Sequence, residues 1–420
     1  MLPNYTITQS ALKGRLVVLG ASTLAITSAF APNAWLNLSV IGVSILSAVS
    51  LGALLAGGMR RLRLDAHVLF ACLLVLQVLA AAVLSPAISE EKLLNHTSAR
   101  LFSIVFIFLL PYILLSSERS AAKAFQVGVT ISLCLCFALL LYDYARVSGL
   151  LALSPVPHIG SLDDLDATIR GFIMRARGGN YEPGHDAAAF VAAIPLALAF
   201  VPAKARIVVV IFFCMAVYLI GYSAALIFWL AIFLAVYSFL EQVHNLRRTL
   251  APLLKTLLGL GAAALLLNYF EVFGDLEDKI FSASYTHRVE SFEEILTGSI
   301  KDWRTFLFGY GPGGYLTLDV TLVANTYAGF LLDLGALGLV LYVAMIIAAL
   351  NQLRKIGNPL YTAAFIAYAL VFLNSIGNYW YPLQWLLLSY PTFALLDKRK
   401  VANLPNQYLN VAPAPLSFRG

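Results

Sequence analysis

The sequence predicts an all-α fold, a bundle of helices that crosses a membrane many times. Of its 420 residues, 60% are hydrophobic and only 12% are charged, whereas soluble domains carry about 25% charged residues. The hydrophobic residues form long continuous runs, unlike the alternating pattern of a membrane β-barrel. Helices satisfy their own backbone hydrogen bonds in lipid. We therefore predict a polytopic helix bundle that forms one domain over residues 1–420.

About twelve hydrophobic runs approach the roughly 17–25 residues that a membrane-spanning helix needs. They lie at 16–31, 35–57, 65–84, 101–116, 121–143, 186–202, 205–221, 223–240, 252–269, 326–349, 359–376 and 381–396. The first run follows Lys13 and Arg15 and ends at Ala29-Phe30-Ala31, a pattern that also fits a cleaved signal peptide. We interpret it as an uncleaved span because the distribution of charge is consistent with its retention.

The basic residues predict the orientation of the chain. With the N-terminus in the cytoplasm, eighteen of the 28 Lys and Arg residues fall in inner segments, together with only four of the 22 acidic residues. Short cytoplasmic loops are enriched in Lys and Arg. Both termini are therefore predicted to be cytoplasmic. The net charge of +6 then reflects topology and does not indicate a nucleic-acid partner.

Three longer segments lie on the outer side in this topology, at 85–100, 144–185 and 270–325. The inner connections are mostly short. Loops on a rigid scaffold commonly carry function. We therefore expect the chemistry of this protein on its outer face, with 144–185 and 270–325 forming most of the site.

The second outer segment concentrates charge and glycine within residues 170–187. Arg175 and Arg177 carry planar groups that suit phosphate or carboxylate. Glu182 precedes a proline, and His185 lies just before the next hydrophobic run. The N-terminus of a helix also attracts anions. The stretch is therefore predicted to be an irregular loop with a candidate anion site at the mouth of a membrane helix.

The third outer segment combines a helical stretch with a glycine-rich run. Arg288 lies in the stretch with amphipathic spacing, and the run 308–315 ends at Tyr315. Its glycines permit unusual backbone angles, which is typical of a connection rich in turns. Asn325 opens the next hydrophobic run, in which Gly335 and Gly338 favour close helix packing.

Several of these motifs resemble those of the O-antigen ligase and polymerase superfamily of bacterial envelope glycosyltransferases. The matching elements are Arg177-Gly178-Gly179-Asn180-Tyr181-Glu182-Pro183, Arg288 with Phe292, 307–315, Asn325-Thr326-Tyr327 and 334–338. Two positions depart from the family pattern. Ala324 stands where the ligase branch usually has a histidine, and Ser223 is followed by Ala224 in place of arginine. The missing histidine favours a polymerase over a ligase.

The resemblance implies a multi-pass enzyme of the bacterial inner membrane that uses no metal or cofactor. Its substrates are glycans linked to undecaprenyl diphosphate at the periplasmic face, and its partners include membrane lipid, a flippase and a chain-length regulator. We assign diphosphate binding to Arg177 and Arg288, assisted by Arg175. Glu182, with His185, is the candidate base, although a helix-capping role fits Glu182 equally well. Tyr315 and Asn325 are candidates for sugar contact or for packing.

Three other interpretations stay open. Asp164 and Asp166 form an Asp-x-Asp pattern that suits a metal-bound diphosphate, although a solvated loop is the preferred interpretation. A ligase would transfer finished glycan to lipid A-core. A transporter or lipid flippase is the commoner function of multi-pass proteins, but transport paths place charges inside the membrane. Asp143 and Asp333 lie toward the ends of predicted spans, so we favour an enzyme.

Overall fold

The computed structural model describes a large part of the chain as a helical bundle. The described residues are 65–84, 89–110, 112, 119–150, 169–170, 173–174, 183–202, 205–220, 224–244, 293, 295, 297, 302–314, 325–375, 385 and 387–395. Apart from one hairpin with two residues in each strand, the regular structure within these ranges is helical. The all-α prediction is confirmed for this part of the chain. The predicted spans 16–31, 35–57 and 252–269 lie outside the described residues.

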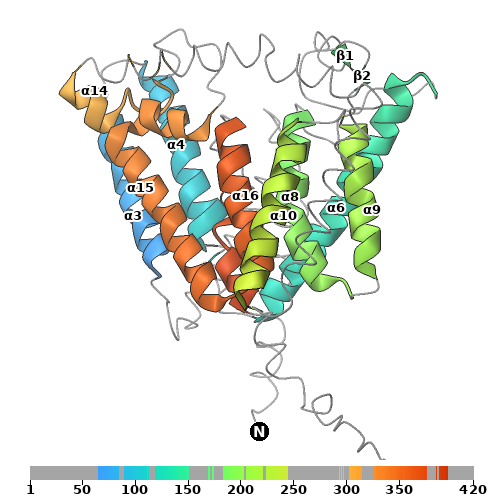
Figure 1. The fold of residues 1–420 in the computed structure, drawn as a ribbon. Helices are drawn as coiled ribbons and strands as arrows, with labels where there is room; N and C mark the ends of the chain where they lie inside the picture. Colours follow the sequence, from blue (N-terminus) through green and yellow to red (C-terminus); the bar gives the residue numbers. More distant parts are fainter. Residues whose placement is uncertain are drawn as a thin grey trace, which may run out of the picture.

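The principal elements follow one another along the chain as α3 (Ala66–Leu84), α4 (Glu90–Phe102), the π-helix η2 (Ser103–Leu109), α6 (Arg119–Val147), β1 (Ile169–Arg170), β2 (Ile173–Met174), α8 (Pro183–Phe200), α9 (Arg206–Leu219), α10 (Ala224–His244), α14 (Trp303–Phe308), α15 (Thr326–Ile356) and α16 (Pro359–Ser375). The long helices lie side by side (Figure 1). The hairpin, α14 and the first turns of α4, α8 and α15 lie at one end, which we call the upper end. The first turn of α3 and the last turn of α15 mark the lower end.

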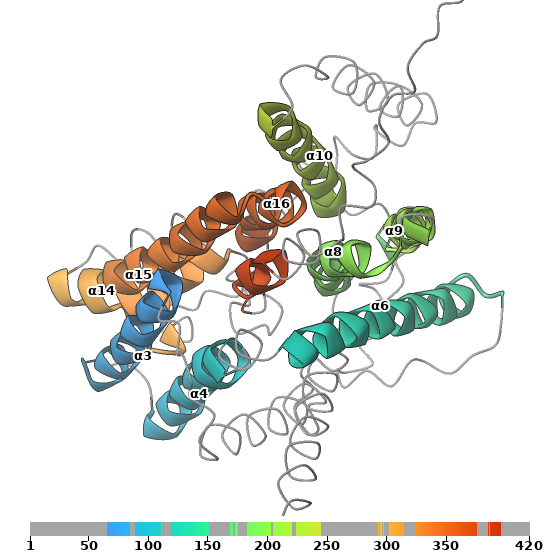
Figure 2. The same ribbon diagram turned by 90° about the horizontal axis from the view of Figure 1, so that it is seen from below.

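The helices pack in two groups that α16 joins (Figure 2). In the first group α15 lies along α3 and contacts α14, and in the second α8 contacts α6 and α9. Helix α16 contacts α8, α10 and α15. Buried aromatic side chains fill the interior, among them Trp229, Trp385, Tyr368 and Phe372. Burying such large rings contributes much of the packing energy of a helical bundle.

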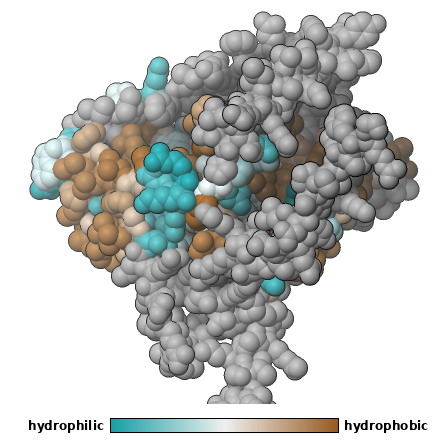
Figure 3. Space-filling view, turned by 60° about the horizontal axis from the view of Figure 1, so that its bottom comes forward, coloured by the Kyte–Doolittle hydropathy of each residue, from teal (hydrophilic) through white to brown (hydrophobic). Residues whose placement is uncertain are grey.

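Three of the described helices are long and apolar enough to cross a membrane. They are α3, the part of α6 from Lys123 to Arg146, and α15. Large hydrophobic side chains also point away from the bundle, and Leu76 and Val340 expose 61% and 63% of their surface. Hydrophobic side chains dominate the flank of the described surface on the left of Figure 3, with hydrophilic patches among them. An outward hydrophobic belt of this kind is what lipid contact requires.

The observed helices differ from the predicted runs mainly at their polar ends. Segment 85–100, predicted to be an outer loop, is helical from Glu90 onward, so the prediction of a loop is wrong for most of the segment, whereas its outer position stays a prediction. Helix α8 begins at Pro183, because proline is favoured in the first turn of a helix. Helix α15 extends past the predicted limit at 349 to Ile356, and its C-cap is Gly357, which adopts the left-handed conformation (φ 73°, ψ 36°).

Candidate functional site

The upper part of α15 is kinked at Gly335. This residue has φ 69° and ψ −171° inside the helix, a conformation that is essentially confined to glycine. The kink interrupts the helical hydrogen-bond ladder, and carbonyl groups beside it bind elsewhere. The backbone N–H of Tyr310 donates to the Leu332 carbonyl at 2.8 Å, and Gln77 Nε2 donates to the Leu334 carbonyl at 2.8 Å. The two carbonyl groups beside the kink therefore accept hydrogen bonds from a loop and from α3.

The glycine-rich loop 309–314 crosses α15 at this kink. Asp302 caps the preceding helix α14, accepting hydrogen bonds from the backbone N–H groups of Arg304 (2.8 Å) and Thr305 (2.9 Å). The helix ends at Phe308, and its C-cap is Gly309, which has φ 75°. A β-carbon at Gly309 would lie 2.5 Å from the Asp333 carbonyl carbon and 2.6 Å from the Gly335 nitrogen. The two backbones are therefore in direct contact, and neither glycine leaves room for a side chain.

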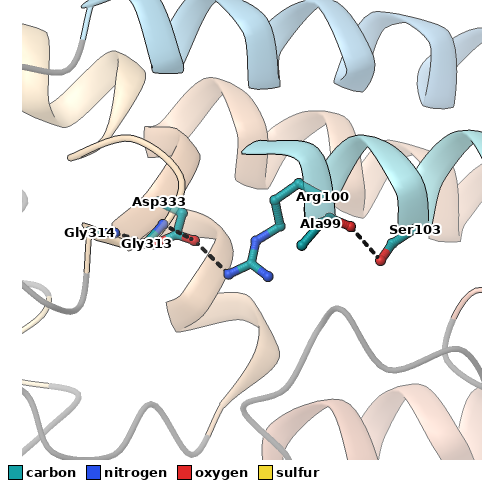
Figure 4. A network of polar contacts seen from close by, with 6 residues as sticks. All are labelled: Ala99, Arg100, Ser103, Gly313, Gly314 and Asp333. Atoms are coloured by element: carbon teal, nitrogen blue, oxygen red, sulfur yellow. Dashed lines mark hydrogen bonds and ion pairs between the residues drawn. The ribbon is translucent and has the colours of Figure 1, made fainter. Parts of the chain in front are cut away.

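A buried ion pair fastens this loop to the bundle (Figure 4). A guanidinium nitrogen of Arg100 lies 3.0 Å from Asp333 Oδ2, and the two side chains expose only 5% and 2% of their surface. The backbone N–H of Gly313 donates to Oδ2 at 3.1 Å, and that of Gly314 donates to Oδ1 at 3.0 Å. Hydrogen bonds to a charged carboxylate are stronger than neutral ones. Asp333 thus links α4, the glycine-rich loop and α15.

His96 lies against the same loop. A β-carbon at Gly313 would lie 2.6 Å from His96 Cδ2, so the imidazole ring packs directly on the glycine backbone. Burial lowers the pKa of His96 below its usual 6.5, and the neighbouring positive charges of Arg100 and Lys92 lower it further against the opposing effect of Asp333. His96 is therefore neutral at neutral pH. It lies on α4 one turn before Arg100.

Acidification is expected to destabilise the wild-type protein through His96. Because the folded-state pKa is depressed, the unfolded chain binds the proton more readily once the pH falls below the usual 6.5. Stability is unaffected by this group above that pH and decreases below it. We expect the unfolding midpoint in detergent to fall more steeply between pH 7 and 5 for wild type than for His96→Gln. Parallel pH profiles would contradict the depressed pKa.

A residue of the segment 270–325 packs beside the kink. Ile295, which follows Arg288 in the chain, is 1% exposed and forms a small apolar cluster with Ala328 and Leu332, against which Tyr310 packs. Glu293, Ile295 and Thr297 are helical, and the Thr297 hydroxyl donates to the Glu293 carbonyl at 2.7 Å. The cluster connects the segment 270–325 to the first turns of α15.

The structure describes two of the predicted site residues. Asn325 is the N-cap of α15, and its side-chain oxygen accepts hydrogen bonds from the N–H groups of Tyr327 (2.8 Å) and Ala328 (3.2 Å). His185 lies in the first turn of α8. Arg175, Arg177, Glu182, Arg288 and Tyr315 lie outside the described residues, as do Asp164 and Asp166. Their roles stay predictions.

The hairpin and α8 delimit the arginine-rich segment. Ile169 pairs with Met174 and Arg170 with Ile173, in antiparallel register. The chain leaves β2 at Met174 and enters α8 at Pro183, and both points lie at the upper end of the bundle (Figure 1). The described boundaries of this segment therefore lie at the same end as the glycine-rich loop.

Arg100 and His96 were not predicted to belong to a structured site. Both residues lie in segment 85–100, which was predicted to be an outer loop. An arginine in a solvated loop needs no partner. One signal was present, because Asp333 lies in a hydrophobic run, and an acid buried in a membrane protein almost always has a cationic partner. The spacing of His96 and Arg100 then places them on neighbouring turns of one helix face.

Comparison with known proteins leaves the family open. No protein-family model matches the chain, and no curated protein matches it. Within the described ranges, no group of three or more His, Cys, Asp or Glu side chains is arranged to hold a metal ion. The molecule is therefore characterised by its own features: a helical bundle with membrane-type helices and an upper end where a glycine-rich loop is fixed by a buried ion pair.

Proposed function

We propose that the protein is a membrane glycosyltransferase that polymerises oligosaccharide repeat units carried on undecaprenyl diphosphate, acting at the periplasmic face of a bacterial inner membrane. One observation carries the proposal. The described residues that flank the predicted site residues in the chain lie together at one end of the bundle. These neighbours are the end of β2, the start of α8, Ile295, the glycine-rich loop and the start of α15. Segments distant in sequence can then act on one substrate.

The proposed reaction breaks the bond between the anomeric carbon of a growing chain and its lipid diphosphate. A hydroxyl oxygen of the acceptor repeat unit attacks that carbon, and the diphosphate leaves with the bonding electrons. Arg177 and Arg288, assisted by Arg175, would neutralise the leaving group, since preorganised positive charge stabilises a developing anion. Glu182, with His185, would accept the hydroxyl proton. Tyr315 and Asn325 would contact sugar, and no metal ion takes part.

The buried ion pair supports an enzyme over a transporter. Asp333 is the acid within the described part of α15, and its carboxylate is bound by Arg100 and by two backbone N–H groups. A carboxylate held in this way serves to position a loop, whereas a transport path needs charges that exchange partners with the cargo. In the proposed enzyme, the pair preorganises the glycine-rich loop at the entrance to the site.

Arg288→Ala is expected to abolish polymerisation. Cells that lack the protein are complemented with wild type, with Arg288→Ala or with Arg304→Ala, and the length distribution of their surface glycan is measured. Arg304 is a matched control because it is exposed at the same end of the bundle, over the ring of Trp303. We expect long chains with wild type and Arg304→Ala, and single repeat units on the final acceptor with Arg288→Ala.

Any other distribution of glycan lengths would lead to a different conclusion. Long chains restored by Arg288→Ala would contradict diphosphate binding by that residue. Long chains that stay on the carrier in cells without the protein would indicate a ligase. Loss of all surface glycan, with single lipid-linked repeats retained inside the cell, would indicate a flippase and overturn the proposal.

A further inference from the structure

We infer that the lower end of the bundle binds one phospholipid whose head group carries both a phosphate and a primary ammonium, as phosphatidylethanolamine does. The site is a cavity of about 740 Å³ between the first turns of α3 and the last turns of α15. Its volume falls within the roughly 300–1,000 Å³ of typical small-molecule sites. The cavity lies at the opposite end of α3 and α15 from the glycine-rich loop (Figure 1), so it is separate from the candidate functional site.

Polar side chains from both helices line the cavity: Asp65, His67, Asn351, Gln352 and Lys355. The Asp65 carboxylate is already oriented by two donors. Its Oδ2 atom accepts hydrogen bonds from Tyr112 Oη at 2.5 Å and from Gln352 Nε2 at 3.0 Å. The acidic group on this side of the cavity is therefore held in a fixed orientation by its hydrogen bonds.

The Gln352 side chain, which lines the cavity, has an unsatisfied acceptor. The NH₂ group of Gln352 donates to Asp65 Oδ2, so the oxygen of the same amide points away from this carboxylate. That oxygen, Oε1, is buried and has no hydrogen-bond partner among the described residues. Leaving a buried acceptor unpaired is costly. An N–H donor on a ligand, next to the negative charge of Asp65, would satisfy it, and a primary ammonium supplies both the donor and the charge.

His67 provides a second unsatisfied atom. Its side chain is 1% exposed, and its Nε2 atom has no hydrogen-bond partner among the residues that the structure describes. The ring is held edge-on to Tyr112, with centroids 4.8 Å apart, and lies 6.0 Å from Phe108. A neutral imidazole can donate or accept through this nitrogen, so a polar head group in the cavity would complete its bonding.

Lys355 provides the complementary charge for a phosphate. It is exposed on the last turn of α15, and its ammonium forms no ion pair within the described part of the chain. Lysine binds phosphate as a point charge. Asp65 on the α3 side and Lys355 on the α15 side give the cavity one acid and one base. A purely anionic head group would face Asp65 unfavourably, whereas a zwitterionic head group matches both charges.

The remaining walls of the cavity suit acyl chains. Phe70, Ile347, Ile356 and Leu395 line it. Ile347 exposes 52% of its surface, and Leu69 on α3 exposes 55%. The apolar wall of the cavity therefore continues onto the outside of membrane-type helices. A polar end beside an apolar flank is the arrangement that a lipid at the membrane surface requires. The occupant is therefore a lipid, and a free phosphate ester would leave the apolar walls uncovered.

The test compares three lipids with identical acyl chains on the purified full-length protein in detergent. Phosphatidylethanolamine has phosphate and N–H donors, phosphatidylcholine has phosphate but no N–H, and phosphatidylglycerol has phosphate without the ammonium. Bound lipid is counted by native mass spectrometry and by the shift of the thermal unfolding midpoint. Loss of one charge-assisted contact corresponds to about tenfold weaker binding, so we expect phosphatidylethanolamine to bind about tenfold more tightly than either competitor.

Variants of the two polar walls make the test specific. Lys355→Gln is expected to weaken phosphatidylethanolamine binding about tenfold, and Gln352→Met to remove its advantage over phosphatidylcholine. Arg354→Gln is the matched control, because Arg354 is the exposed neighbour of Lys355 and does not line the cavity. Equal binding of the three lipids by wild type, or equal effects of the Lys355 and Arg354 variants, would overturn the proposal. So would binding of soluble glycerophosphoethanolamine as tight as that of the lipid.

Discussion

Replacement of Arg100 by methionine is expected to lower the free energy of unfolding by about 3–5 kcal/mol, the usual cost of removing one partner of a buried ion pair. Methionine fills a similar volume but leaves the Asp333 carboxylate, 2% exposed, without its counter-charge. The two glycine N–H groups that still bind this carboxylate cannot neutralise it. The loss should be apparent in denaturant titration of the protein in mixed micelles.

A double variant separates the charge effect from packing. Arg100→Met combined with Asp333→Asn removes both charges and keeps one amide oxygen for the glycine N–H groups, so it should recover part of the lost stability. Lys92→Met is the control, since Lys92 is exposed on the same helix, and surface substitutions usually change stability by less than about 0.5 kcal/mol. An Arg100→Met effect as small as that of Lys92→Met would show that the pair does not hold the loop.

Gly335→Ala is expected to be comparably damaging, by roughly 3 kcal/mol or more, because backbone strain and steric overlap act together. Gly335 has φ 69° and ψ −171°, and a β-carbon there would overlap the backbone of Leu307. The variant must straighten the kink or push the glycine-rich loop away from α15. Hydrogen exchange at the N–H groups of Gly313 and Gly314 should therefore increase along with the loss of stability.

Gly357→Ala is the matched control for this substitution. Gly357 also has a positive φ, 73°, but a β-carbon there would meet no atom within 4 Å. Only the conformational cost of about 1 kcal/mol applies, and the exchange of the loop N–H groups should be unchanged. If the two variants lose equal stability, then strain alone explains the effect and the backbone contact at Gly335 contributes nothing.

Hydrophobic runs predicted several of the described helices closely. The run 65–84 corresponds to α3, the run 205–221 to α9, and the run 359–376 to α16. These helices consist almost entirely of apolar residues, so the limits of the run coincide with the limits of the helix. The prediction was wrong at Glu90–Arg100, because a helix whose outward side is polar continues without a hydrophobic run. The same reason explains the final turns of α15.

The candidate site was predictable only in part. The unusual composition of 308–315 correctly indicated turns that require glycine, and Gly309 and Gly313 have φ 75° and 90°. The partner of Asp333 was not predictable, because Arg100 is 233 residues distant in the chain and one sequence contains no information on which distant residues meet. The crossing of Gly309 and Gly335 depends on tertiary packing for the same reason.

The distance in sequence between Arg100 and Asp333 also has a consequence for biogenesis. Helix α4 leaves the ribosome while the acidic partner of Arg100 is still 233 residues from being synthesised. A cation at the edge of a hydrophobic run, as Arg100 is at the start of the run 101–116, can reach the aqueous boundary by extending its side chain. The nascent α4 must therefore keep Arg100 in contact with water, and the upper end of the bundle closes only after α15 has been inserted.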